Sequence, residues 1–261
     1  MKNPKQFFMI VCFISAVVIL FSTEKINNLE LFNTIGYQDG FVYFSVLNPV
    51  YVGEDKDEKL IFNAAKEVAK FLSIDLAYNS SAYPIGSFYL NNNTIFVDYN
   101  TDLIAEVLPY IKVTLPKKLD FGTVSAVKIS TSSINELWNK VNSSNYPDYS
   151  DIISFVNTNY PEWFYNLPTK SGYIFGLGIS DDMSNLEKKF EMSDYRSMVD
   201  AINTLSIKVS NELNRYDSRY LNLYNLFSSQ SSRASISGIK IIKRYYLEEY
   251  GLSFSLSVLR L

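Results

Sequence analysis

The sequence predicts an α+β protein of two tandem, related repeats that follow an N-terminal hydrophobic helix. Three observations support this: an apolar N-terminal stretch, similar segments recurring about 130 residues apart, and a change of hydrophobic period within each repeat. Helical spacing followed by alternation predicts a long helix packed on a small, mostly antiparallel sheet. The expected divisions are a leader at 1–22, a first repeat at 35–130, a linker at 131–160 and a second repeat at 161–261.

The leader has the pattern of an export signal. Lys2 and Lys5 precede the mostly apolar stretch Phe7–Phe21, as in a secretory signal peptide. As a helix this stretch would span about 22 Å, which is less than the roughly 30 Å hydrocarbon core. Ser22 suits a cleavage site but Leu20 does not, so a cleaved signal peptide and an uncleaved membrane anchor both stay open. We expect export to the cell envelope.

Composition excludes several classes of function. The chain has no histidine, and its single cysteine, Cys12, lies inside the leader. The folded part therefore lacks an imidazole base, a thiolate nucleophile and a Cys/His zinc site. A net charge of −3 without a basic stripe disfavours nucleic-acid binding. We expect no catalytic residue, no cofactor and no metal.

Four pairs of similar segments indicate an internal duplication. Their offsets are 132, 133, 128 and 129 residues. The pairs are Gly40–Val46 with Gly172–Gly178, Ala69–Leu76 with Ile202–Val209, Ile111–Val113 with Ile239–Ile241, and Gly122 with Gly251. Matches in one order at nearly constant spacing predict two copies of one unit.

Each repeat is expected to open with a strand, at 41–46 and 173–179, and to continue into a helix. In the first helix, three- and four-residue steps place these apolar residues on one face: Leu60, Ile61, Ala64, Ala65, Val68 and Leu72. The second helix is expected from about Met183 to Thr204, with Asp194 interrupting this inward side: Leu186, Phe190, Ala201 and Ile202.

Alternation of apolar and polar residues predicts the strands that follow the helices. It predicts strands at 72–76 and 205–209, and a closing hairpin at 111–114 and 123–129 in the first repeat. In the second repeat, a strand with Ile239 and Ile241 leads to a turn at 248–251. The last strand alternates Leu252, Phe254, Leu256 and Val258 with Ser253, Ser255 and Ser257. We expect its apolar face to be dry and its serine face to be wet.

The stretch between the repeats, 131–160, is rich in Asn, Ser, Tyr and Asp. We expect an exposed loop at 142–148. Short helical turns are expected on either side of it, at 134–141 and 152–156.

The segments Pro161–Pro168, Tyr173–Ser180 and Ser237–Ile241 resemble a bacterial envelope family, the small outer-membrane lipoproteins of the Lpp-twenty type. The resemblance covers 161–261, and reaches the first repeat only through the duplication. It implies a non-catalytic surface or envelope role and brings no catalytic residues. The helix here is poorer in alanine than in that family, and no lipobox precedes Cys12, so lipid anchoring does not carry over.

Four aromatic residues form the candidate interaction site: Tyr160, Trp163, Phe164 and Tyr165. Aromatic rings of this kind can stack on sugar rings. Alternatively, Trp163 can fill the core where the chain enters the second repeat.

Gly176-Leu-Gly178 follows a predicted strand, as in a dinucleotide-binding fingerprint. Asp181 stands where the third glycine is required, and its carboxylate would repel a pyrophosphate. We therefore expect these glycines to relieve crowding between strand and helix.

Two groups of charged residues allow both a functional and a structural interpretation. Asp181, Asp182, Glu187 and Glu191 could form an acid–base pair or bind calcium, or could begin a solvated helix. Lys240, Lys243 and Arg244 could meet anionic lipid or glycan, or could protect an exposed strand. The structural interpretation is simpler in both cases.

These observations favour a non-catalytic structural or interaction protein of the bacterial cell envelope. Its expected partners are other envelope proteins or a second copy, and the membrane if the leader is retained. The alternative is a carbohydrate- or peptidoglycan-binding protein that uses Trp163 and the neighbouring tyrosines. A carboxylate-based hydrolase is a third hypothesis.

Overall fold

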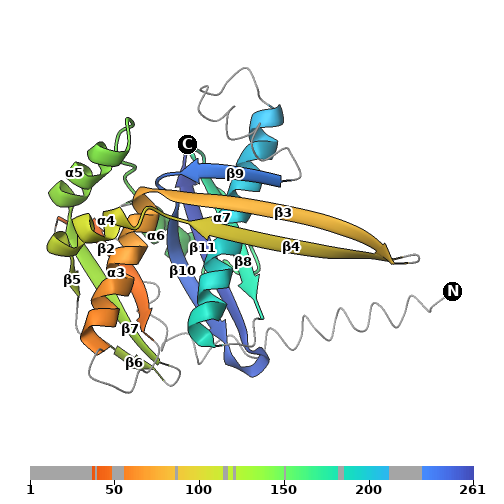
Figure 1. Ribbon diagram of the computed structural model, residues 1–261, viewed down its shortest axis with the longest axis horizontal. Coiled ribbons are helices and arrows are strands. Elements are labelled where there is room, and N and C mark those ends of the chain that lie inside the picture. The colour runs from red at the N-terminus through yellow and green to blue at the C-terminus, as the bar shows by residue number, and fades with distance from the viewer. Residues whose placement is uncertain are drawn as a thin grey trace.

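The computed structural model describes residues 37–38, 40–48, 56–85, 88–113, 117–119, 122–149, 151–181, 185–211 and 231–261. Five α-helices and three small antiparallel sheets are formed by these residues, which confirms the predicted α+β class (Figure 1). The leader at 1–22 lies outside the described residues.

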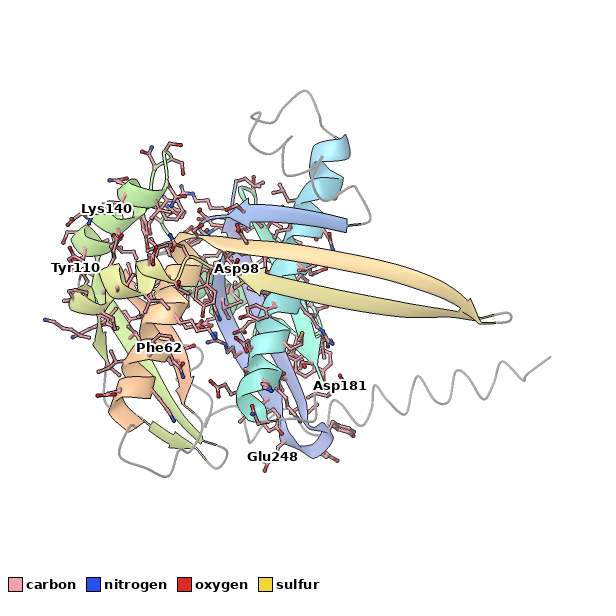
Figure 2. All side chains as sticks on the ribbon, viewed as in Figure 1. Phe62, Asp98, Tyr110, Lys140, Asp181 and Glu248 are labelled. Atoms are coloured by element: carbon pink, nitrogen blue, oxygen red, sulfur yellow. The ribbon has the colours of Figure 1, made fainter. Side chains whose placement is uncertain are left out.

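The first sheet has the strand order β1-β2-β7-β5, and β6 also pairs with β7. Its strands are β1 (Tyr37–Gln38), β2 (Phe41–Asn48), β5 (Lys112–Val113), β6 (Lys117–Leu119) and β7 (Gly122–Ser130). Helix α3 (Lys56–Leu72) buries the predicted apolar face, except that Ile61 is 40% exposed. That part of the prediction is wrong, because Ile61 is exposed together with its neighbour Phe62, which is labelled in Figure 2. A short helix, α4 (Asp102–Val107), and a 3-10 turn, η2 (Leu108–Tyr110), precede β5.

The second sheet has the order β10-β11-β8 and is wholly antiparallel. It consists of β8 (Tyr173–Ser180), β10 (Lys240–Leu247) and β11 (Leu252–Arg260), with the 3-10 turn η3 (Glu248–Tyr250) before β11. The predicted turn at 248–251 is confirmed, and Gly251 closes it at a φ of 62°, in the left-handed region that favours glycine.

Helix α7 (Leu186–Asn211) lies on this second sheet and is longer than predicted. The strand expected at 205–209 is therefore wrong. Leu205 belongs to a series of buried residues at three- and four-residue steps: Met198, Ala201, Ile202 and Leu205. Five residues of alternation were too short to reveal that the helical period continues through them.

The third sheet has the order β4-β3-β9 and joins segments far apart in the sequence. It contains β3 (Ile74–Ile85), β4 (Phe88–Asp98) and β9 (Ser231–Ile236). Strand β9 pairs with β3 only between Ile74 and Asn79. Beyond that point the β3–β4 hairpin continues as two strands and projects from the rest of the protein (Figure 1).

Two helices, α5 (Thr131–Val141) and α6 (Ile152–Asn159), occupy the positions of the predicted helical turns. The N-terminus of α5 is capped because the Ser130 side chain accepts a hydrogen bond from the Ser133 backbone N–H, at 3.1 Å. Trp138 is buried and donates from Nε1 to the Ser144 carbonyl at 2.7 Å. The segment after α5 is thereby attached to the core.

The larger hydrophobic core is shared by the first and second sheets. It contains Phe44 of β2 and Val68 of α3 together with Leu256 and Val258 of β11. A second core lies under α7 and includes Ile74, Ile202 and Ile236. The larger core therefore joins the first and second sheets, and the second core joins α7 to the third sheet.

Candidate functional site

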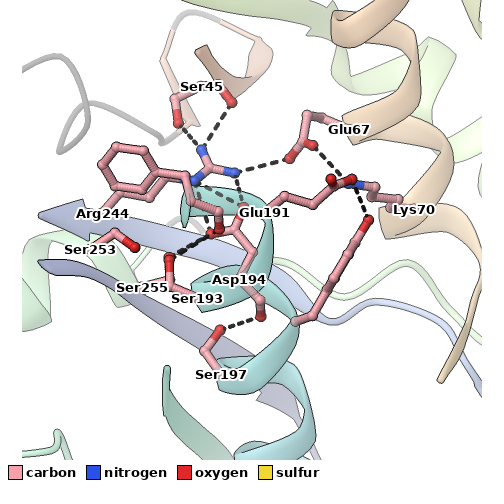
Figure 3. Close-up of polar contacts among 12 residues, drawn as sticks. Ser45, Glu67, Lys70, Glu191, Ser193, Asp194, Ser197, Arg244, Ser253 and Ser255 are labelled. Atoms are coloured by element: carbon pink, nitrogen blue, oxygen red, sulfur yellow. Dashed lines mark hydrogen bonds and ion pairs between the residues drawn. The ribbon is translucent and has the colours of Figure 1, made fainter. Parts of the chain in front are cut away.

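The most unusual interior feature is a cluster of charged and polar residues between the first and second sheets, which we call the junction cluster: Ser45, Glu67, Lys70, Glu191, Asp194 and Arg244 (Figure 3). Arg244 of β10 is 5% exposed. Its Nε lies 3.0 Å from Asp194 Oδ1, and its Nη2 lies 2.8 Å from Oδ2. Such two-point contact fixes both side chains in one geometry.

Arg244 also reaches the first half of the chain. Its Nη1 donates to the Ser45 carbonyl at 3.1 Å, and its Nη2 donates to Glu67 Oε2 at 3.1 Å. Since Ser45 lies on β2 and Glu67 on α3, one guanidinium connects four elements.

The interpretation of Lys240, Lys243 and Arg244 as an exposed face is wrong, because all three are at most 5% exposed.

The cluster continues towards the surface through α3 and α7. Lys70 Nζ lies 3.2 Å from Glu67 Oε1, and Lys66 Nζ lies 3.0 Å from Glu191 Oε1. The Tyr195 hydroxyl donates to the same Glu191 oxygen at 2.7 Å. Glu191 is thus engaged in a network rather than being only a solvated charge at the start of a helix.

Burial and neighbouring charges oppose one another in setting the pKa values here. For Glu67, burial raises the pKa, but Lys70 and Arg244 outweigh burial and hold that pKa below its usual value. For Asp194, burial prevails over Arg244 and raises the pKa. For Arg244, burial lowers the pKa but Asp194 and Glu67 raise it by more. The guanidinium therefore stays charged, as the structure requires.

The space around the cluster is too small for a substrate. Two cavities beside it have volumes of about 20 and 50 Å³, which suffice for only a few water molecules. No group of His, Cys, Asp and Glu side chains suited to a metal occurs among the described residues. With its partners already engaged, the cluster can hold the two halves in register.

The structure places the four predicted aromatic residues in different environments. Trp163 is 3% exposed and lies in the larger core. Phe164 stacks on Tyr245 with ring centres 4.9 Å apart, while Tyr165 is 51% exposed. Tyr160 is half-buried, packs on Phe155 and hydrogen-bonds Thr169. Of these rings, Tyr165 is the one open to solvent.

Gly176 and Gly178 lie where α7 approaches β8 most closely. An added Cβ on Gly176 would overlap the Ser197 carbonyl and the Ala201 nitrogen, and one on Gly178 would overlap the Ser193 carbonyl. The glycines therefore admit the helix backbone, as the crowding interpretation proposed. Asp181 is exposed, and Asp182 lies outside the described residues.

The serine face of β11 is also against α7, so the predicted wet face is wrong. Ser253, Ser255 and Ser257 are all 0% exposed. Ser253 and Ser257 donate to the carbonyls of Lys189 and Ser197 at 2.9 and 2.8 Å. Their hydroxyls are buried because the helix supplies partners in place of water.

Sequence reasoning missed the partners of Arg244, which are distant along the chain. In the sequence, Asp194 is an interruption of an apolar stripe, and Lys240 and Arg244 are charges in a predicted strand. The signal available in the sequence was the pair of Asp194 and Arg244, because a buried charge needs an opposite charge nearby.

No described helix is long and apolar enough to cross a membrane. Comparisons with protein-family models, with curated proteins and with solved structures found no match for this chain. The resemblance to the Lpp-twenty type therefore stays a prediction from the sequence.

Proposed function

We propose that the protein is a non-catalytic interaction protein of the bacterial cell envelope. Location is inferred from the basic and apolar leader and from the resemblance over 161–261. The absence of histidine, and an interior whose charged groups contact one another, support a role without catalysis. Other envelope proteins or a second copy are the partners in this proposal.

The observation that carries the proposal is the projecting part of the β3–β4 hairpin, residues 80–85 and 88–93, which we call the arm. The antiparallel register continues from Asp75 opposite Asp98 to Ile85 opposite Phe88. Within the described residues, β3 is the only strand that pairs with β4. A two-stranded ribbon is marginally stable in water, so a third strand from a partner would stabilise the arm.

The composition of β4 suits the addition of a strand. Its sequence from Phe88 to Asp98 contains no proline and no lysine, the residues that commonly protect exposed strand edges. An unprotected edge offers backbone N–H and C=O groups to an extended segment of another chain.

We also propose that the two halves arose by duplication, as the segment pairs predict. Three strands of the first sheet, in the order β2-β7-β5, correspond to the order β8-β11-β10 of the second sheet, while β1 and β6 have no counterpart there. In each half, the last strand (β7 or β11) lies between an early strand (β2 or β8) and a later one (β5 or β10), and a long helix follows the early strand. These correspondences support the proposal.

Site-specific photo-crosslinking in intact cells tests the interaction role. A photoreactive residue replaces Asn92 in the arm, and the matched control replaces Asn166, an exposed residue of the body. We expect a discrete adduct from position 92 in the envelope fraction and much less from position 166. Free monomer from both positions would contradict the proposal.

The location is tested separately. Intact mass and N-terminal sequencing of the native protein from separated envelope fractions will show whether the leader is cut and where the chain resides. Recovery of the protein with its leader from the cytosolic fraction would remove the envelope from the proposal.

A further inference from the structure

A polar pocket lies between α5 and the loop that follows it. Its volume is about 450 Å³, within the range of roughly 300–1,000 Å³ typical of small-molecule sites. The lining residues are Thr131, Asn135 and Asn139 of the helix and Asn145, Tyr146 and Asp148 of the loop. The three helix residues are four positions apart, so they form one row along α5.

The loop wall is held in place from beneath. Trp138 Nε1 donates to the Ser144 carbonyl at 2.7 Å, and Asn142 Nδ2 donates to the Leu72 carbonyl at 3.2 Å. Tyr149 donates to the Gly238 carbonyl at 2.5 Å. Tyr146 packs edge-on against Trp138, with ring centres 5.9 Å apart. A wall fixed in this way is preorganised, so a ligand would not have to order it.

The lining chemistry narrows the class of ligand. Asn135, Asn139 and Asn145 are amides, and each offers two N–H donors and a carbonyl acceptor. Asn135 Oδ1 is buried and has no hydrogen-bond partner among the described residues. Asp148 is the one carboxylate in the lining and no lysine or arginine lines the pocket, so the lining does not favour an anion. One carboxylate is also fewer than calcium sites usually provide.

We infer that this pocket binds a neutral saccharide. Sugar hydroxyls both donate and accept hydrogen bonds, which matches the amides of Asn135, Asn139 and Asn145. An apolar ligand would leave those amides without partners. Tyr146 supplies the aromatic ring that sugar sites commonly use. The inference does not depend on the arm or its partner, and the site differs from the aromatic segment around the buried Trp163.

Calorimetric titration of the full chain tests the inference. The protein is kept in a detergent without a sugar headgroup and is titrated with N,N′-diacetylchitobiose, cellobiose and maltose. We expect saturable binding of at least one of them. Asn139→Ala and Asn145→Ala should each weaken that binding about five-fold, the effect of losing one hydrogen bond.

Two controls keep the test specific. Asn166→Ala removes an exposed amide outside the pocket, and Tyr165→Ala removes the exposed ring of the aromatic segment. Both should bind as the unchanged protein does, and circular dichroism should show equal melting for all variants. The inference is overturned if none of the three sugars binds, if the pocket variants bind normally, or if Tyr165→Ala alone abolishes binding.

Discussion

The two halves of the protein pack a helix on a sheet in opposite ways. In the first half, β2 presents Phe44 and Val46, and Phe44 meets Phe71 of α3 edge-on at 5.6 Å. At the positions that correspond in the predicted alignment, β8 carries Gly176 and Gly178. There the backbone of α7 replaces the missing side chains.

The difference shows that one strand order can be stabilised by side-chain volume or by close backbone approach. Packing by side-chain volume tolerates substitution, because a truncated side chain leaves a cavity that its neighbours can partly fill. Close backbone approach does not tolerate a larger side chain, because an added methyl group meets backbone atoms that cannot rotate away. The serine hydroxyls of β11 contribute to the close backbone approach in the second half, because they donate hydrogen bonds to α7 carbonyls.

The largest expected effect comes from Gly178→Ala. The added methyl would overlap the Ser193 carbonyl, so we expect a loss of more than about 3 kcal/mol in the free energy of unfolding, or no folding. The comparison is Val46→Ala in the first half, where the loss of two buried methyl groups should cost roughly 2 kcal/mol. Urea unfolding measures both. Equal losses would show that the two halves do not differ as described.

Arg244→Met should have the next largest effect. It would leave Asp194, which is 4% exposed, as a buried carboxylate without its guanidinium, which typically costs about 3–5 kcal/mol. Adding Asp194→Leu should recover part of the loss, because the unpaired charge disappears. Lys140→Met breaks an exposed ion pair with Glu136 and should change stability by less than about 0.5 kcal/mol. A double variant no more stable than Arg244→Met would contradict this account.

A smaller effect on the stability of the fold is expected from a change of pH. Burial lowers the pKa of Lys240 to about 7 and that of Lys243 to about 8, so between pH 7 and 10 the unfolded chain binds more protons than the folded chain. Stability should therefore rise with pH across that window. In Lys240→Met the rise should be shallower, and thermal unfolding from pH 7 to 9.5 measures it. An unchanged slope would show that Lys240 does not cause it.

Elements with a strong local period were predictable from the sequence. The strands at 41–46 and 173–179 and the inward face of α3 follow from apolar spacing alone, apart from Ile61. The arm was not predicted, because β4 contains a run of three asparagines, Asn91–Asn93, with no apolar alternation to reveal it. The pairing of β9 with the base of β3, between Ile74 and Asn79, depends on a segment from the other half of the chain.

The functional features were harder to predict, for a physical reason. Ser253, Ser255 and Ser257 look like a solvent face until the glycines of β8 bring α7 onto them. The pocket row of Thr131, Asn135 and Asn139 lay within a stretch interpreted as linker, because polar residues on a short helix resemble loop composition. A second segment changes the environment of ordinary polar residues in both cases: α7 covers the serines, and the loop after α5 faces the helix row.

The pairing of β3 with β9 has a consequence for biosynthesis. Ile74 lies opposite Ile236, about 160 residues later in the chain. A ribosome therefore completes the first half long before that ladder can close, and contacts of such sequence separation slow folding. During this interval one side of β3 is an open template for aggregation, so chaperone capture or delayed folding would protect the nascent chain.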